Sequence, residues 1–274
     1  MKNIRMLILI NCLLICGIAV YGAEISGIVL NAQTRKPVEF VNVGITAKGI
    51  GTVSGTDGRF RLPADSALAN DTVRFSMIGY NDFQIPVAGL TGASGNEILL
   101  TEKVYDLTEV VVRPKIFKEK TLGVTTRFKQ FSAGFKDNIL GYECGILMEV
   151  KKTAFIKSVN INIAQCTYDS ICFRLNIYKA AADSDFVNIL RDPIYIRMPK
   201  AGGRDGINVD LQSENIVVNG NFLVTLEHIR DLGPGNLNFC ASLSEQTWLR
   251  KTSQGKWVTA PVGVSISVIA DVEK

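Results

Sequence analysis

Histidine is almost absent from this chain: His228 is the only one among 274 residues. Zinc sites that hydrolyse peptides need two or three His, Glu or Cys ligands and a general base. No Cys-x-x-Cys pair occurs either, and no cysteine lies beside His228. The sequence therefore predicts no metal and no other cofactor, and we expect His228 to be a surface or strand-edge residue.

Charge is also scarce. Charged residues make up 20% of the chain, and the net charge of +4 includes Lys2 and Arg5 of an N-terminal leader, which leaves +2 without them. Nucleic-acid binding needs a clustered basic face, so we expect no nucleic-acid partner. Hydrophobic residues make up 47%, which is enough for a buried core and untypical of a disordered chain.

Long apolar runs are confined to the N-terminus. Lys2 and Arg5 precede the apolar stretch from Met6 to Val20, and small residues follow it at Gly22 and Ala23. This pattern predicts a signal peptide over residues 1–23, because the stretch is short for a span of about 20 residues. A lipid anchor at Cys16 is disfavoured by the large Ile15 before it. We expect an exported mature chain without a transmembrane segment, in the periplasm or at the outer-membrane surface.

Four cysteines remain beyond the leader: Cys144, Cys166, Cys172 and Cys240. An even number in an exported protein permits disulfides. Cys166 and Cys172 flank the predicted tip of a hairpin and would then lie opposite one another. A Cys166–Cys172 disulfide is thus one prediction, and four free, half-buried thiols are the alternative.

Short strands and turns fill residues 24–112. Apolar residues alternate over 41–45 and again over 72–77, which is the period of a half-buried strand. Asp57-Gly58 predicts a tight turn between two strands. Several strands at this spacing, without a helical period, predict a small antiparallel β-sandwich.

The remaining residues predict a second all-β domain. Residues 113–123 form a basic connector in which Pro114 suits the end of an element. Residues 159–163 and 173–177 alternate across a short loop and predict a hairpin. About nine or ten strands over residues 124–274 fit a jelly-roll-like sandwich.

Five motifs point to a known family. They are Ser26-Gly-Ile-Val, Pro37-Val-Glu-Phe-Val-Asn-Val, Gly51-Thr-Val-Ser-Gly-Thr-Asp-Gly-Arg-Phe, Phe75-Ser-Met-Ile-Gly-Tyr and Leu107-Thr-Glu-Val-Val-Val. With them, residues 24–112 resemble the carboxypeptidase regulatory-like domain, which implies a seven-stranded transthyretin-like sandwich and no peptidase activity. The version found ahead of starch-utilisation-type, TonB-dependent transporters is the most similar. Here Arg113-Pro-Lys follows instead of a plug, and we expect no transporter barrel in the remaining chain.

The second half resembles a sandwich that accompanies this domain in short exported bacterial proteins. That resemblance is carried by Glu143-Cys-Gly, Ile156-Lys-Ser-Val-Asn-Ile, Phe173-Arg-Leu-Asn-Ile-Tyr and Arg250-Lys-Thr-Ser-Gln-Gly-Lys-Trp257. Residues 107–112 could be offered to another protein's sheet, as a TonB box is, but we favour the last strand of the first domain.

Catalytic patterns are missing. Ser54 in Gly51-Thr-Val-Ser-Gly55 is not in the place of a nucleophile elbow, and no base lies nearby. Acids such as Glu143, Glu149 and Asp210 show no spacing that selects a pair for glycoside hydrolysis. Residues 205–210 offer oxygen ligands but depart from the calcium loop of an EF-hand. We therefore expect no enzyme.

Two tryptophans bracket a basic loop near the C-terminus. Trp248, Arg250, Lys256 and Trp257 could contact a ligand by stacking on a sugar or on a partner's surface. The favoured alternative is that both rings cap the core. The sequence thus predicts a non-catalytic exported envelope protein, a structural or protein-recognition module. The second hypothesis is a carbohydrate-binding accessory of an outer-membrane glycan-uptake system. The partner is accordingly an envelope protein or a glycan.

Overall fold

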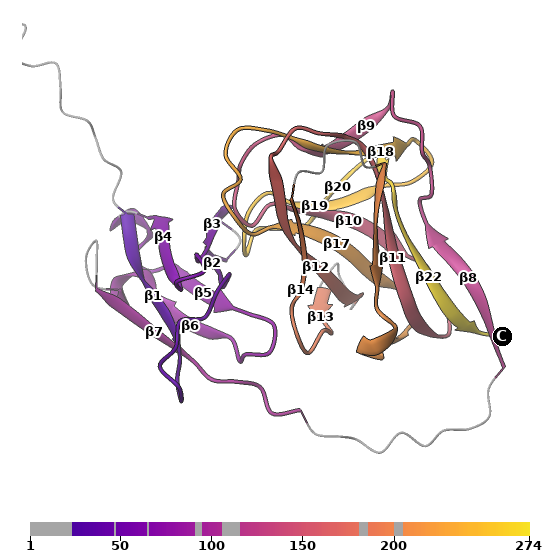
Figure 1. The fold of residues 1–274 in the computed structure, drawn as a ribbon. Helices are drawn as coiled ribbons and strands as arrows, with labels where there is room; N and C mark the ends of the chain where they lie inside the picture. The colour runs from indigo at the N-terminus through magenta and orange to yellow at the C-terminus, as the bar shows by residue number, and fades with distance from the viewer. Residues whose placement is uncertain are drawn as a thin grey trace, which may run out of the picture.

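The computed structural model describes residues 24–46, 48–64, 66–90, 95–105, 116–180, 186–199 and 205–274, and it is almost entirely β (Figure 1). No helix within these ranges has the length and apolar character needed to cross a bilayer. The predicted signal peptide and the motif at residues 107–112 lie outside the described residues.

Residues 24–105 form two small sheets packed face to face. One sheet has the order β4-β1-β7 and the other β3-β2-β5-β6, which confirms the seven-stranded sandwich. The strands are β1 (Glu24–Asn31), β2 (Asn42–Ile45), β3 (Ile50–Val53), β4 (Arg59–Pro63), β5 (Thr72–Ser76), β6 (Phe83–Pro86) and β7 (Asn96–Leu100), with short 3-10 turns at Ser66–Leu68 and Val87–Gly89. The β1–β7 pair is parallel, an exception to the predicted antiparallel pattern.

Alternation explains the core of this first domain. Val43 and Ile45 of β2 and Val73 and Phe75 of β5 have no exposed surface, and they pack in one cluster between the sheets. The predicted turn before β4 is present, and Gly58 takes a φ of 75°, a conformation that glycine adopts without strain.

The second domain is a larger sandwich of a seven-stranded and an eight-stranded sheet. The first contains β10 (Glu143–Met148), β12 (Ser170–Ala180), β13 (Phe186–Asn188), β14 (Ile194–Pro199), β17 (Phe222–His228), β19 (Thr247–Arg250) and β20 (Val258–Ala260). The second contains β8 (Phe117–Gly123), β9 (Ser132–Phe135), β11 (Thr153–Cys166), β15 (Gly206–Asp210), β16 (Val217–Asn219), β18 (Leu237–Ser242), β21 (Gly263–Val264) and β22 (Ile266–Glu273). A 3-10 turn lies at Gln212–Glu214.

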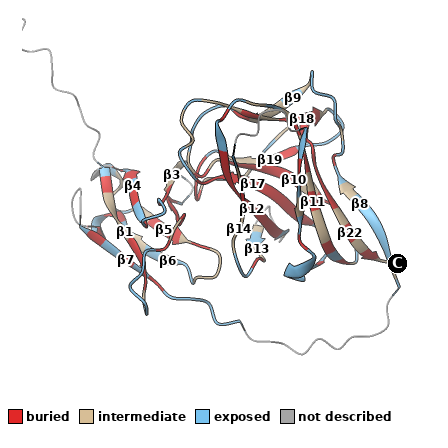
Figure 2. Ribbon diagram, viewed as in Figure 1, coloured by how far each residue is buried: buried red, intermediate tan, exposed pale blue. Residues whose placement is uncertain are grey.

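Successive long strands of this domain alternate between the two sheets, as in a jelly roll. Strand β10 is followed by β11 in the opposite sheet, and β12 returns to the sheet of β10. Their inward residues form the main core, which Figure 2 shows as buried positions along β10, β12 and β17. Nine or ten strands were predicted; the larger number here comes from short edge strands such as β13, β16 and β20.

Two sequence predictions need correction. Residues 159–163 and 173–177 do not form a hairpin, because β11 and β12 belong to different sheets. Periodicity shows which face of a strand is buried, but it does not show which strand is its neighbour. The basic connector also ends before Phe117, since residues 117–123 are strand β8 on the edge of a sheet beside β22. Edge strands commonly carry lysines, so the charge of this segment did not exclude a strand.

Without a hairpin between β11 and β12, the predicted Cys166–Cys172 disulfide loses its structural basis. Cys166 ends β11 in one sheet, and Cys172 lies in β12 of the other, where it packs with Phe40 and Val53 of the first domain. The two residues therefore do not face each other across a hairpin. All four cysteines within the described residues are free thiols.

Candidate functional site

A row of charged side chains crosses the outer face of the β12-β17-β10-β19 sheet. Strand register places Arg174 opposite Glu227, Glu227 opposite Glu143, and Glu143 opposite Arg250. Each of these residues alternates with an apolar neighbour that enters the core, so the period of two brings all four to one face. The row reads positive, negative, negative, positive across four strands.

The two central carboxylates are completely buried and densely hydrogen-bonded. Glu143 Oε1 accepts bonds from Asn176 (2.9 Å), Tyr178 (2.8 Å) and Thr225, and its Oε2 accepts one from Arg250 Nε at 2.7 Å. Glu227 Oε2 accepts bonds from Arg174 Nε (3.0 Å), Arg174 Nη2 (2.8 Å) and Asn176 (2.8 Å). The side-chain amide of Asn176 thus bridges both carboxylates.

The pKa values of these two carboxyl groups move in opposite directions. Burial raises the pKa of Glu143, and the nearby Glu227 adds to this effect against the attraction of Arg250. Burial also acts to raise the pKa of Glu227, but Arg174 and Arg250 outweigh it and the pKa falls below its ordinary value. Two arginines beside Glu227 against one beside Glu143 explain the difference. Burial likewise raises the pKa of Tyr178, which keeps its hydroxyl protonated as a donor.

This network continues into the first domain. Arg174 Nη1 donates to the carbonyl oxygen of Phe40 at 2.9 Å and contacts Met77 Sδ at 3.1 Å. A second connection comes from the loop after β19, where Ser253 donates to Asn42 at 2.9 Å and Gln254 donates to Ser76 at 2.7 Å. Buried charge and polar bonds therefore fix the first domain against this sheet.

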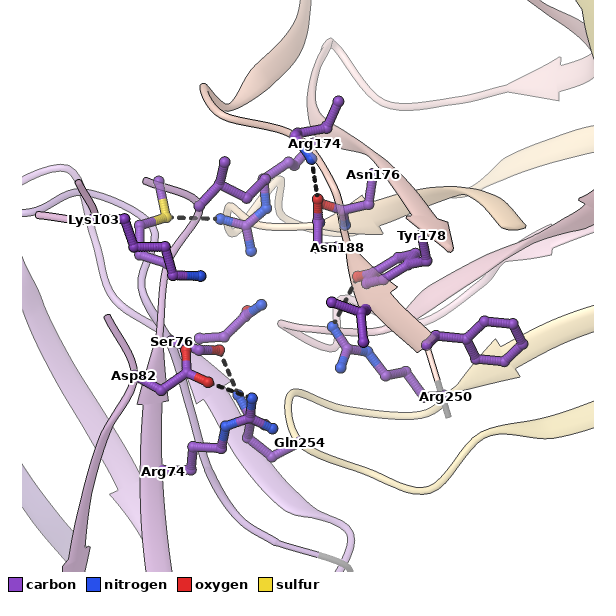
Figure 3. Close-up of a pocket in the computed structure, with 16 residues that line it drawn as sticks. Arg74, Ser76, Asp82, Lys103, Arg174, Asn176, Tyr178, Asn188, Arg250 and Gln254 are labelled. Carbon is purple, nitrogen blue, oxygen red and sulfur yellow. Dashed lines mark hydrogen bonds and ion pairs between the residues drawn. The ribbon is translucent and has the colours of Figure 1, made fainter. Parts of the chain in front are cut away.

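A cleft of about 200 Å³ opens where the two domains meet (Figure 3). The second domain contributes mainly polar groups and two rings, those of Tyr178 and Phe186, and the first contributes residues of β5 and the turns beside it. The lining includes Asn176, Tyr178, Phe186, Asn188, Arg250 and Gln254 from the second domain and Arg74, Ser76, Asp82 and Lys103 from the first. Neither Glu143 nor Glu227 lines the cleft, because both lie beneath it. The walls can thus offer amides, guanidinium groups and two aromatic rings to a polar ligand.

Four aromatic rings gather beside this cleft. Phe186 meets Trp248 with ring centres 5.0 Å apart and Trp257 at 5.4 Å, and Trp257 meets Tyr178 at 5.7 Å. The guanidinium of Arg250 lies 5.1 Å from the centre of the Trp257 ring. Both tryptophans are half-buried on the outer face of the sheet, so they do not cap the core as the favoured alternative predicted.

The structure therefore brings three of the four predicted contact residues together: Trp248, Arg250 and Trp257. Of these three, only Arg250 lines the cleft, and the two tryptophans lie beside it; Lys256 is exposed and contacts neither ring in the cluster. Arg174, Glu227 and the residues of the first domain were not predicted to belong to this site. A usable signal was present, because Phe173-Arg-Leu-Asn-Ile177 places charged and amide side chains on one face of an otherwise apolar strand.

The other candidates from the sequence lie elsewhere. The prediction that His228 lies on the surface or at a strand edge is wrong. His228 is fully buried against Phe173, and their ring centres are 5.2 Å apart. His228 is the last residue of β17, and every residue of this strand is buried. The sequence pattern did not indicate this burial. Ser54 is buried and its hydroxyl accepts a bond from the Val41 amide, a backbone role as expected.

The acids proposed for calcium or catalysis are also separated from the cleft. Asp205 and Asp210 lie at opposite ends of β15; Asp205 pairs with Lys129 at 2.5 Å, and Asp210 accepts the backbone amide of Gln212. Glu149 is exposed beyond β10. No group of three or more His, Cys, Asp or Glu suited to a metal is found within the part of the chain that is described.

Comparison with known proteins places the first domain in a family. No curated protein matches the chain. Among solved structures, a candidate carbohydrate binding protein from Bacteroides uniformis ATCC 8492 shares 12% identity over 89% of this chain and 98% of its own, with a TM-score of 0.24. The VP2 subviral particle of infectious bursal disease virus shares 10% identity over 91% of this chain and 63% of its own, with a TM-score of 0.18. At these TM-scores neither likeness carries an argument.

The family model of the CarboxypepD_reg-like domain matches residues 25–112. This range covers β1 to β7 and all five motifs that carried the resemblance in the sequence. Residues 25–112 of this chain are therefore a carboxypeptidase regulatory-like domain.

Proposed function

We propose that this protein is an exported, non-catalytic binding module of the cell envelope, and that it binds a glycan in the cleft between its two domains. The observation that carries the proposal is the aromatic cluster around Phe186, which joins a cleft lined with amides and guanidinium groups. Sugar rings stack on aromatic faces, and amide and guanidinium groups supply the hydrogen bonds that orient hydroxyls. A concave polar site of this kind suits a small ligand better than it suits the flat surface of a partner protein.

The proposal of a non-catalytic role is supported by the burial of the acid pair. Glu143 and Glu227 have no exposed surface and are covered by Arg174 and Arg250. A general acid or base must come within hydrogen-bond reach of the substrate, and each of these carboxylates already accepts bonds from buried donors. Their bonds to neighbouring strands indicate a role in holding Arg250 and Tyr178 in position.

Binding is tested by titrating residues 24–274 with a panel of neutral and acidic oligosaccharides while tryptophan fluorescence and heat are recorded. We expect at least one glycan to change the emission of Trp248 and Trp257, and F186A to weaken its binding at least about tenfold. Phe128→Ala is the control, because Phe128 is 58% exposed and does not line the cleft. If no glycan in the panel produces heat or a fluorescence change, the proposed function is wrong.

Catalysis is tested on the same mixtures by chromatography after prolonged incubation. We expect every oligosaccharide to be recovered intact. Release of shorter products that E143Q abolishes would overturn the non-catalytic part of the proposal and leave the binding part standing.

Protein recognition remains a second candidate because exposed apolar side chains gather around the start of β8, a strand on the side of the second domain away from the first (Figure 1). Ile116 and Val217 are 68% and 45% exposed, and Phe155 is 41% exposed with its ring 5.0 Å from that of Phe117. Such a patch is a common protein-binding feature. Crosslinking in intact cells tests it: a specific adduct that F155S removes would favour this function, and identical adducts in both would count against it.

A further inference from the structure

A second cavity between the domains lies next to the cleft. Met77, Ile78 and Lys103 line both spaces, so only this short wall separates them. The second cavity measures about 750 Å³, within the range of about 300–1,000 Å³ typical of small-molecule sites. The first, at about 200 Å³, is smaller than that range. A ligand held in the first space would therefore place one terminal group there and extend past Lys103.

The charges of the first cleft do not cancel. Three arginines line it and each has a carboxylate partner: Arg74 pairs with Asp82 at 2.5 Å, Arg174 with Glu227 at 2.8 Å and Arg250 with Glu143 at 2.7 Å. Lys103 is the fourth cation of the lining. Its ammonium group points into the cleft (Figure 3), and no carboxylate among the described residues pairs with it. The cleft thus has one surplus positive charge, and Lys103 carries it.

The second cavity has a different character. Three tyrosines line it, Tyr80, Tyr105 and Tyr195, and the ring of Tyr105 lies 5.5 Å from the guanidinium of Arg191. Of its three acids, Glu39 pairs with Arg197 at 3.3 Å, and the other two, Glu102 and Asp192, equal its cations Lys103 and Arg191 in number, so this cavity has no surplus positive charge. An anionic group is therefore favoured only on the first side of Lys103, and the second space suits uncharged rings that stack on tyrosine.

We propose that the ligand is an acidic oligosaccharide: its anionic residue occupies the first cleft in an ion pair with Lys103, and its uncharged neighbours extend into the tyrosine-lined cavity. This inference rests on the proposed glycan-binding function. A carboxylate and a sulfate share the chemistry that Lys103 recognises, and the test below separates them. Lys103 would be the residue that determines specificity for charge.

The test uses matched ligand pairs that differ only in charge. Oligogalacturonides are compared with their methyl esters, and carrageenan oligosaccharides with the desulfated products, by calorimetry on residues 24–274. We expect one acidic member to bind about tenfold more tightly than its neutral partner, and K103Q to remove that preference while neutral binding persists. Lys120→Gln is the control, since Lys120 lies on the exposed edge strand β8.

The second cavity is tested by chain length. We expect affinity to rise from the disaccharide to the tetrasaccharide in the wild type, and Tyr105→Ala to reduce that gain. Equal binding of charged and neutral partners, or a preference that survives in K103Q, would overturn the inference while the proposed function stands. Absence of binding by every charged and neutral glycan would overturn both. Preference within only one of the two ligand pairs identifies the anion as carboxylate or sulfate.

Discussion

Arg174 and Glu227 form an ion pair that is almost completely removed from water. Two guanidinium nitrogens of Arg174 donate to one carboxylate oxygen of Glu227, at 3.0 and 2.8 Å, and the side chains are 1% and 0% exposed. The remaining terminal nitrogen of Arg174 bonds to the carbonyl oxygen of Phe40 in the first domain. The same side chain thus neutralises a buried charge and connects the two domains.

Removing one partner of this pair is expected to destabilise the protein strongly. R174M leaves the carboxylate of Glu227 buried beside only Arg250, whose nearest nitrogen is 3.8 Å from it. We expect the free energy of unfolding to fall by about 3–5 kcal/mol, measured by urea denaturation. The double variant R174M/E227L removes both charges, and we expect it to recover much of this loss.

A solvent-exposed ion pair in the first domain serves as the control for the buried pair. Arg35 and Glu97 form an ion pair at 2.7 Å with side chains 52% and 54% exposed. We expect R35M to change stability by less than about 1 kcal/mol. Similar losses in R174M and R35M would show that burial does not set the strength of the Arg174 pair.

Gly51 permits the close approach of the two domains. It lies in β3, and a Cβ atom at this position would overlap the carbonyl oxygen of Ser253 in the second domain. Because a strand accepts valine readily, we expect Gly51→Val to leave the first sandwich folded but to separate the domains. Small-angle scattering should show a larger radius of gyration. Gly89→Ala is the control, since its Cβ would meet only the movable side chain of Ile85.

Scattering and ligand binding should change together in Gly51→Val. The proposed site takes residues from both domains, so separation would remove it. Unchanged scattering would mean that the loop around Ser253 yields, and the contact would then not determine how the domains are held.

His228 should make stability depend on pH. Burial lowers its pKa below the ordinary value of 6.5, with partial opposition from the backbone of Arg230. The unfolded chain therefore takes up a proton at a pH where the folded protein does not. This contribution to stability is complete above about pH 6.5 and is lost as the pH falls below it, by at most about 1.4 kcal/mol per pH unit.

His228→Phe removes the titrating group and keeps a ring among the neighbouring aromatics Phe135 and Phe173. Urea denaturation of wild type and variant at pH 8 and pH 5 measures the effect. We expect the variant to gain stability relative to wild type towards pH 5. Parallel losses in both proteins would rule out His228 as the cause.

The cysteines should behave as four unreactive thiols. Burial raises the pKa of Cys144, Cys166 and Cys240, and Cys172 is itself buried at the domain contact. Because the thiolate is the reactive form, we expect slow reaction with a thiol reagent at pH 8 in the folded protein. In denaturant without reductant, four thiols should react. A count of two would show that a disulfide forms in the exported protein.

Several features could be predicted from local sequence because they depend on local geometry. Alternation predicted the buried faces of β2 and β5, and the Asp57-Gly58 pair predicted the turn before β4. The five motifs of the first domain identified its family because they occur together within one matched range, residues 25–112. The aromatic and basic residues near the C-terminus were also identified, although only their side-chain types indicated a contact site.

Other features depended on which strands become neighbours. The incorrect hairpin between β11 and β12 followed from alternation, which is equally compatible with pairing and with crossing to the opposite sheet. Glu143 and Glu227 are 84 residues apart in sequence, the difference of their numbers, and become neighbours only because β10 pairs with β17. No spacing within either segment predicts that meeting.

The sequence by itself determined that this protein is all β, because period-two alternation fixes strand faces, and that its first third is a carboxypeptidase regulatory-like domain. The tertiary structure alone decided where the polar cleft between the domains would lie. That cleft depends on strand order and on the close contact between the two domains at Gly51. Arg174, Lys103 and Phe186 are distant in sequence, and they line the same cleft only because the segments that carry them pack together.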